Sequence, residues 1–150
     1  MNNHHESVTP QLQLSVEQFY YQEARLLDNR QYQTWLGLVD PSISYSMPGR
    51  SNPMVDNRES GDESMIEVER ELDGIDSSGL PIRDESYAFL FLRVERSFKK
   101  NAWAENPPAR TRRIVGNVEI TGVDGDRLSV LSNFHLFYAR PGLDDFFYAG

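Results

Sequence analysis

The spacing of apolar residues is mainly helical in the first part of this chain of 150 residues and alternating in the last part, and that order limits the folds open to it. In the first part, apolar residues recur at helical spacing, as at Val16, Phe19 and Tyr20. From Ile114 onward, apolar and polar residues alternate, which is the period of a β-strand. Helices followed by consecutive strands favour an α+β protein, in which N-terminal helices pack on one face of a curved antiparallel sheet.

Local signals set the expected ends of these elements. A glutamine three residues after Ser15 completes a capping box, which predicts that the first helix begins at Ser15. A proline after Asp40 predicts the end of a second helix. Asp84 is predicted to cap a further helix, and Asp124-Gly125 predicts the turn between two long strands.

The length of the chain favours one domain, residues 1–150, with residues 1–14 as a flexible tail. The sequence has no cysteine, which excludes disulfides and thiolate metal ligands from this chain. Its apolar stretches are shorter than a membrane span, and Met1–Pro10 lacks the pattern of a signal peptide. We therefore expect a cytoplasmic protein that does not enter a membrane.

The net charge of −8 is unevenly distributed. Asp56–Glu85 carries 11 acidic and three basic residues, whereas Arg93–Arg113 carries seven basic and two acidic residues. The run Glu59–Asp76 lacks the spacing of a calcium loop, so a solvated acidic surface is favoured over a cation site. An acidic chain is also a poor partner for nucleic acid, whose phosphates repel it.

His135 is the one histidine within the segments that are predicted to fold. It could act as a general base in a pocket, with Asp40 as a distant carboxylate partner. The other interpretation is a histidine that packs in the core or at an interface, and it is favoured because the sequence shows no evident partner for the ring. The first interpretation predicts a stand-alone isomerase, dehydratase or hydrolase.

Three arginines near the start of the alternating segment are candidate partner contacts. Alternation along a strand places Arg110 and Arg112 on one face and Arg113 on the other. Arginine binds carboxylates with two parallel hydrogen bonds and tolerates burial at interfaces. Two alternatives stay open: docking to acidic groups of a neighbouring subunit, or an internal ion pair with Glu95, Glu105 or the acidic segment.

The two tryptophans are the remaining candidate anchors. Trp35 lies on the apolar face of the second predicted helix, which favours packing in the core. Trp103 lies in an irregular segment beside prolines, where an interface contact and a local packing role are about equally favoured.

Three ordered stretches then point to a family. They are Phe19–Asp28 with Trp35-Leu36; Tyr45–Arg50; and Leu92–Arg96 with Ala102–Arg113 and Asn117-Val118. The most specific part is the run Pro-Pro-x-Arg-Thr-Arg-Arg that begins at Pro107. Together these stretches resemble the small (beta) subunit of bacterial aromatic-ring-hydroxylating dioxygenases, from about Gln18 to Gly150.

The resemblance implies a cone-shaped α+β fold like that of nuclear transport factor 2 and a structural, non-catalytic role. In such an oxidoreductase three small subunits support three large subunits, which carry the Rieske iron–sulfur cluster and the mononuclear iron, so no cofactor or metal is expected in this chain. The assembled enzyme would use dioxygen and electrons from reduced nicotinamide to dihydroxylate an aromatic compound during its catabolism. Family members usually continue past the position of Gly150, so this sheet is expected to lack its last strands.

Overall fold

The computed structural model describes residues 8–47, 83–99, 107–140, 142 and 146–149. Helices and antiparallel strands make up these residues, which confirms the α+β class. The chain divides into two compact units, Met1–Leu38 with Val94–Gly150, and Val39–Arg93. Each unit has its own antiparallel sheet, and the single domain 1–150 stays a prediction.

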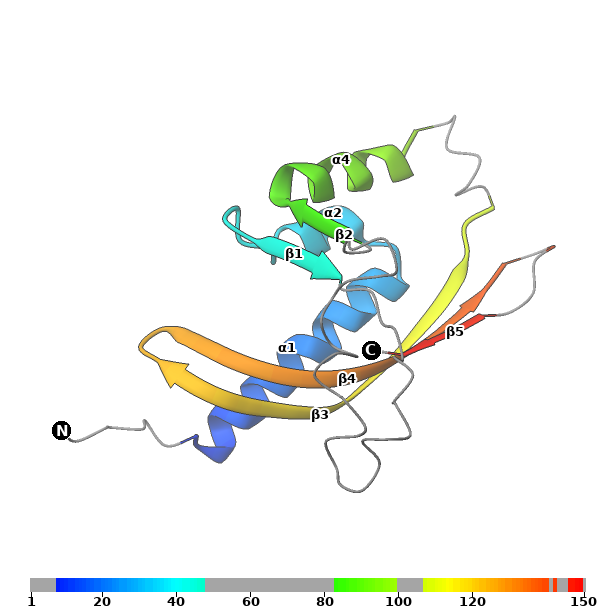
Figure 1. The fold of residues 1–150 in the computed structure, drawn as a ribbon. Helices are drawn as coiled ribbons and strands as arrows, with labels where there is room; N and C mark the ends of the chain where they lie inside the picture. Colours follow the sequence, from blue (N-terminus) through cyan, green and yellow to red (C-terminus); the bar gives the residue numbers. More distant parts are fainter. Residues whose placement is uncertain (1–7, 48–82, 100–106, 141, 143–145, 150) are drawn as a thin grey trace, which may run out of the picture. The chain divides into compact units, whose positions relative to one another are not determined.

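The first unit is a long helix against a three-stranded sheet (Figure 1). Its elements are α1 (Pro10–Asp28), the short α2 (Tyr32–Leu36), β3 (Arg110–Asp124), β4 (Arg127–Ala139) and β5 (Phe146–Ala149). The strands pair in the order β3-β4-β5, and α1 contacts β3. The predicted turn is confirmed, because β3 and β4 are joined at Gly125, whose φ of +56° favours glycine.

Buried apolar side chains hold α1 against its neighbours. Val16 and Ala24 are buried, as the helical spacing predicts, and Ile120 is buried on β3. Phe19 lies on the predicted apolar face but is exposed, whereas Leu26 is buried outside that face. The difference arises because α1 contacts both β3 and α2, so more than one stripe of the helix is covered.

The predicted start of the first helix is wrong. The helix begins at Pro10, and the Thr9 hydroxyl accepts a hydrogen bond from the Leu12 N–H at 3.2 Å. Proline is well suited to the first helical position, because its φ is already helical and it lacks an N–H to satisfy. Ser15 instead lies inside the helix, where its hydroxyl donates to the Gln11 carbonyl.

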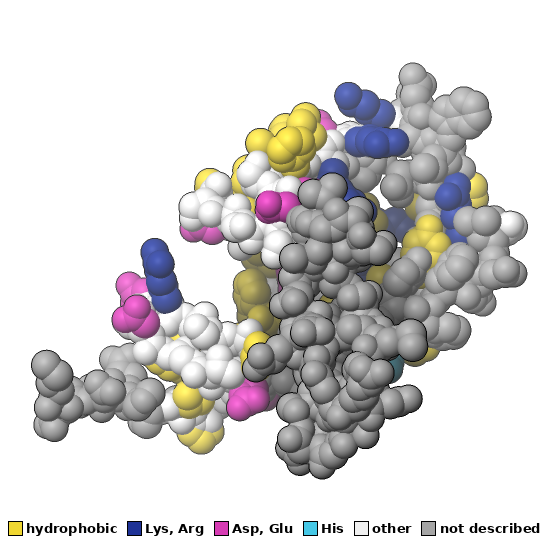
Figure 2. All heavy atoms as spheres, in the orientation of Figure 1, with side chains coloured by type: hydrophobic (Ala, Val, Ile, Leu, Met, Phe, Trp, Pro, Cys, Tyr) yellow, Lys and Arg dark blue, Asp and Glu magenta, His cyan; other side chains and the backbone are white. Residues whose placement is uncertain are grey.

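The second unit contains a two-stranded antiparallel sheet of β1 (Ser44–Met47) and β2 (Arg83–Ser86). The helix α4 (Tyr87–Ser97) follows β2 directly, and its first seven residues belong to this unit. The predicted cap at Asp84 is therefore wrong, because Asp84 pairs in β2 opposite Ser46. Hydrophobic side chains gather on the surface of α4 (Figure 2), where Phe89, Phe91 and Leu92 are exposed.

A bulge interrupts β3 and changes which residues face α1. Gly116 pairs with Asn133 and Glu119 pairs with Leu131, so two residues of β3 stand opposite one of β4. Asn117 takes up the extra length with a φ of +50°. The strict alternation predicted from the sequence therefore changes phase at this point.

The left-handed conformation of Asn117 predicts a residue-specific effect on stability. Replacing Asn117 with valine is expected to lower the free energy of unfolding by about 1–2 kcal/mol, because a β-branched residue is strained there. Asn117→Gly should be neutral or slightly stabilising. Urea unfolding of both variants measures this, and equal losses for valine and glycine would contradict the assignment of the bulge.

Candidate functional site

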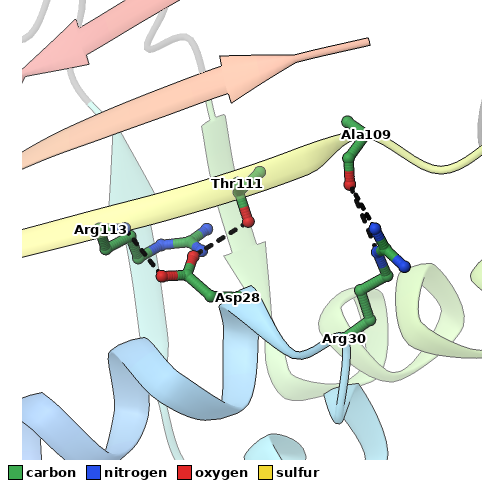
Figure 3. Close-up of polar contacts among 5 residues, drawn as sticks. All are labelled: Asp28, Arg30, Ala109, Thr111 and Arg113. Carbon is green, nitrogen blue, oxygen red and sulfur yellow. Dashed lines mark hydrogen bonds and ion pairs between the residues drawn. The ribbon is translucent and has the colours of Figure 1, made fainter. Parts of the chain in front are cut away.

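A buried carboxylate joins the end of α1 to the start of β3 (Figure 3). Asp28 Oδ1 lies 2.6 Å from Arg113 Nη1 and accepts a hydrogen bond from the Thr111 hydroxyl at 2.9 Å. Asp28 Oδ2 accepts from the Arg113 backbone N–H at 2.8 Å. The Asp28 side chain is only 4% exposed and that of Arg113 23% exposed, so this cluster is shielded from water.

The turn after α1 makes a second connection to the same strand. The Arg30 guanidinium donates two hydrogen bonds, at 3.1 and 3.3 Å, to the carbonyl of Ala109, just before β3 begins. Arg30 has a φ of +58°, a conformation that non-glycine residues seldom adopt. Its backbone N–H donates to the Leu27 carbonyl, which closes the helix end. Asp28 and Arg30 together anchor the first residues of β3.

The three candidate arginines have different surroundings in this structure. Arg113 faces Asp28, so the internal ion pair is the alternative that holds for it, with a partner that the sequence analysis did not name. Arg110 and Arg112 are exposed, and no hydrogen bond or ion pair is recorded for either side chain in the described part of the chain. They could therefore bind carboxylates of another molecule.

One signal in the sequence could have pointed to Asp28. An acidic residue at the last position of a helix is unfavourable, because the carboxylate lies beside the negative end of the helix dipole. Such a residue is stable there when a cation neutralises it. Arg113, 85 positions later, supplies that cation, but a long-range pair of this kind has no local pattern.

His135 and Asp40, the candidate acid–base residues, belong to different compact units, and each is described within its own unit. His135 is exposed on β4, opposite Ile114 on one side and Ala149 on the other. Asp40 belongs to the other unit, where its carboxylate accepts hydrogen bonds from the Ser42 N–H at 2.7 Å and the Ser42 hydroxyl at 2.6 Å.

Of the other candidates, Trp35 is among the described residues and Trp103 is not. Trp35 is half-buried, and its ring N–H donates to Glu23 at 3.0 Å, in keeping with packing against α1. Trp103, Glu105 and the run Glu59–Asp76 lie outside the described residues. Within the described ranges there is no group of three or more His, Asp or Glu side chains placed to hold a metal ion. None of the described helices has the length and apolarity needed to cross a bilayer.

Comparison with known proteins gives one consistent family. The family model described as "Ring hydroxylating beta subunit" matches residues 22–150. The chain is 33% identical over 131 residues to the benzene 1,2-dioxygenase subunit beta of Pseudomonas putida, covering 87% of this chain and 64% of that protein. It is 30% identical to the 3-phenylpropionate/cinnamic acid dioxygenase subunit beta of Photorhabdus laumondii, covering 99% of this chain and 76% of that protein. The chain thus spans about two thirds to three quarters of the length of these two relatives.

Solved structures show the same relationship. A chain of naphthalene 1,2-dioxygenase with indole bound in the active site superimposes with a TM-score of 0.70 and 25% identity, covering 95% of this chain and 69% of that chain. The beta subunit of benzoate 1,2-dioxygenase from Burkholderia mallei superimposes with a TM-score of 0.63 and 21% identity, covering 96% of this chain and 76% of that chain. The second likeness concerns the fold alone.

Proposed function

The chain belongs to the family of ring hydroxylating beta subunits, and from this premise we propose that it is the non-catalytic small subunit of an aromatic-ring-hydroxylating dioxygenase. The observation that carries the proposal is the family match, which spans residues 22–150. Relatives are named as beta subunits of benzene, biphenyl and 3-phenylpropionate/cinnamic acid dioxygenases. The substrate class that we propose for the whole enzyme is therefore an aromatic ring compound.

The chain has the α+β fold of the solved dioxygenase beta subunits, the nuclear transport factor 2-like fold that the sequence resemblance implies. In the proposal, this subunit holds large subunits and further copies of itself in place, in the cytoplasm and without nucleic acid or membrane. The large subunit supplies the Rieske cluster and the mononuclear iron, which reduce dioxygen for addition to the ring. The residues of this chain contribute binding and rigidity.

The exposed arginines of β3 support a docking role. Arg110 and Arg112 lie on a strand whose first residues are anchored through Asp28 and Arg30, so their backbone is preorganised. Preorganised cations lose less conformational freedom when they bind carboxylates. Arg113 supports the strand from the opposite face. Trp103 remains a proposed contact that the described residues do not include.

The alternative of a stand-alone enzyme has less support. It needs His135 close to a carboxylate, with the reacting proton within hydrogen-bond reach. Among the described residues, His135 makes no recorded hydrogen bond to an acid, and the Asp40 carboxylate is engaged by Ser42. The family match therefore favours the assembly role.

Co-purification tests the proposed function. The chain is expressed together with an affinity-tagged Rieske-type large subunit, and an unrelated tagged protein serves as the control. We expect the chain to be retained by the large subunit in a fixed ratio through size-exclusion chromatography, and not by the control. Loss of the chain at the first wash would contradict the proposal.

A further inference from the structure

The two ends of the β3–β4 hairpin carry opposite charges. Arg110 and Arg112 lie at the open end, where β3 begins. Glu119 lies towards the other end, and Asp124 and Asp126 lie at the turn, where acidic side chains are visible at the left of Figure 2. Arg127 is at the same end, so three carboxylates there stand against one guanidinium.

Each charged end also exposes a large apolar side chain. Ile114 follows Arg112 on β3 and is 60% exposed. Leu131 pairs directly with Glu119 and is 62% exposed. We call Arg110, Arg112 and Ile114 the basic patch, and Glu119, Asp124, Asp126 and Leu131 the acidic patch. An apolar residue beside unpaired charges is typical of a protein–protein contact with a defined register.

The patches cannot neutralise each other within one molecule. Glu119 is seven positions after Arg112, and at about 3.3 Å per position this places the two residues roughly 23 Å apart along the strand. That separation exceeds the screening length of about 8 Å at physiological salt. Within residues 8–47, 83–99 and 107–140, none of the charged side chains of the two patches makes a hydrogen bond or ion pair. Both patches are therefore open to an external partner of opposite charge.

We propose that the basic patch of one copy of this chain docks on the acidic patch of a second copy. The occupant is a second copy because both complementary halves lie on the same two-stranded ribbon, in the same described unit. A contact between two different patches is head-to-tail, and repeated contacts of this kind close into a ring when the rotation allows. This inference rests on the proposed function, in which small subunits form trimers, and it identifies the surface that joins them.

Charge reversal tests the contact. The variant R110E/R112E and the variant E119R/D124R each place like charges across the interface, so each should weaken self-association at least about tenfold. The quadruple variant, which combines all four substitutions, restores attraction across the contact. Its dissociation constant for self-association should lie within about threefold of that of the unchanged chain. Sedimentation velocity of the full chain measures the self-association. The control variant R96E/K99E changes the net charge by the same amount as R110E/R112E, but on exposed residues outside both patches, and it should leave self-association unchanged.

A mixing experiment tests the ring. Mixed R110E/R112E and E119R/D124R chains attract only when they alternate, and a three-membered ring cannot alternate throughout. The mixed chains should therefore associate as weakly as each variant alone. If the mixture associates as strongly as the unchanged chain, the contact forms a two-fold symmetric dimer and the ring is wrong. If both reversed variants keep the unchanged chain's urea-unfolding curve and associate normally, or if the unchanged chain stays monomeric, the proposed contact is wrong.

Binding to the large subunit is measured separately. If reversed variants associate normally but the unchanged chain still co-purifies with the large subunit, only the patch contact is overturned. If the large subunit never retains the unchanged chain, the proposed function fails as well. If every charge-reversed variant, including the quadruple variant, fails to bind the large subunit, then the patches contact the large subunit. In that case a second copy of this chain is the wrong partner.

Discussion

Replacement of Asp28 with alanine is expected to lower the free energy of unfolding by about 3 kcal/mol. The Asp28 carboxylate accepts hydrogen bonds from the Thr111 hydroxyl and from the Arg113 backbone and side chain, and it is almost fully buried. Removal of one partner of a buried ion pair costs about 3–5 kcal/mol, because the other charge stays buried without compensation. Relief of the unfavourable helix-dipole interaction returns at most about 1 kcal/mol, so the loss dominates.

The matched control is Glu85→Ala. Glu85 pairs with Arg93 at 2.8 Å and with Arg83 at 3.2 Å, and its own side chain is 16% exposed, but the two arginine side chains are 47% and 38% exposed, so water reaches both cations. Exposed pairs contribute about 0–1 kcal/mol, so the urea midpoint of Glu85→Ala should change far less. A loss for Asp28→Ala as small as that for Glu85→Ala would show that the junction in Figure 3 does not anchor β3.

Omission of this chain is expected to cause the largest functional effect. A large subunit produced alone should yield at least about tenfold less soluble protein. It should form correspondingly less dihydroxylated product from its aromatic substrate when dioxygen, reduced nicotinamide and its electron-transfer proteins are supplied. A partner present at about 100 times its Kd stabilises the folded state by about 2.7 kcal/mol, and loss of that stabilisation shifts the folding equilibrium about a hundredfold. Product formation and soluble large subunit are measured together.

Specific activity separates this effect from chemistry. The rate per folded large subunit should be restored when the chain is present during expression, in proportion to the amount of complex. R96E/K99E should restore it as fully as the unchanged chain. A large subunit that is equally soluble and equally active without this chain would contradict an assembly role.

The sequence could predict the features that local spacing determines. The change from helical to alternating period gave the α+β order, and Asp124-Gly125 gave the hairpin turn. Alternation also placed Arg113 on the face of β3 opposite Arg110 and Arg112. These predictions succeed because each depends on residues close together in the chain.

Features that depend on distant contacts could not be predicted in the same way. The Asp28–Arg113 pair joins residues far apart in the chain, and burial decides its strength. The bulge at Asn117 changes the face of later residues without any break in the apolar pattern. The first helix starts at Pro10 because Thr9 and Pro10 form a better helix start than the capping box at Ser15.

The central claim is that this chain supports assembly and does no chemistry, and the double variant His135→Ala/Asp40→Ala tests it most directly. The measurement is the rate of dihydrodiol formation per large subunit in the purified complex. The account predicts a rate within about twofold of the unchanged complex. Loss of a general acid or base lowers a rate by about 10²–10⁴-fold, so a fall of that size with the complex intact would contradict the account.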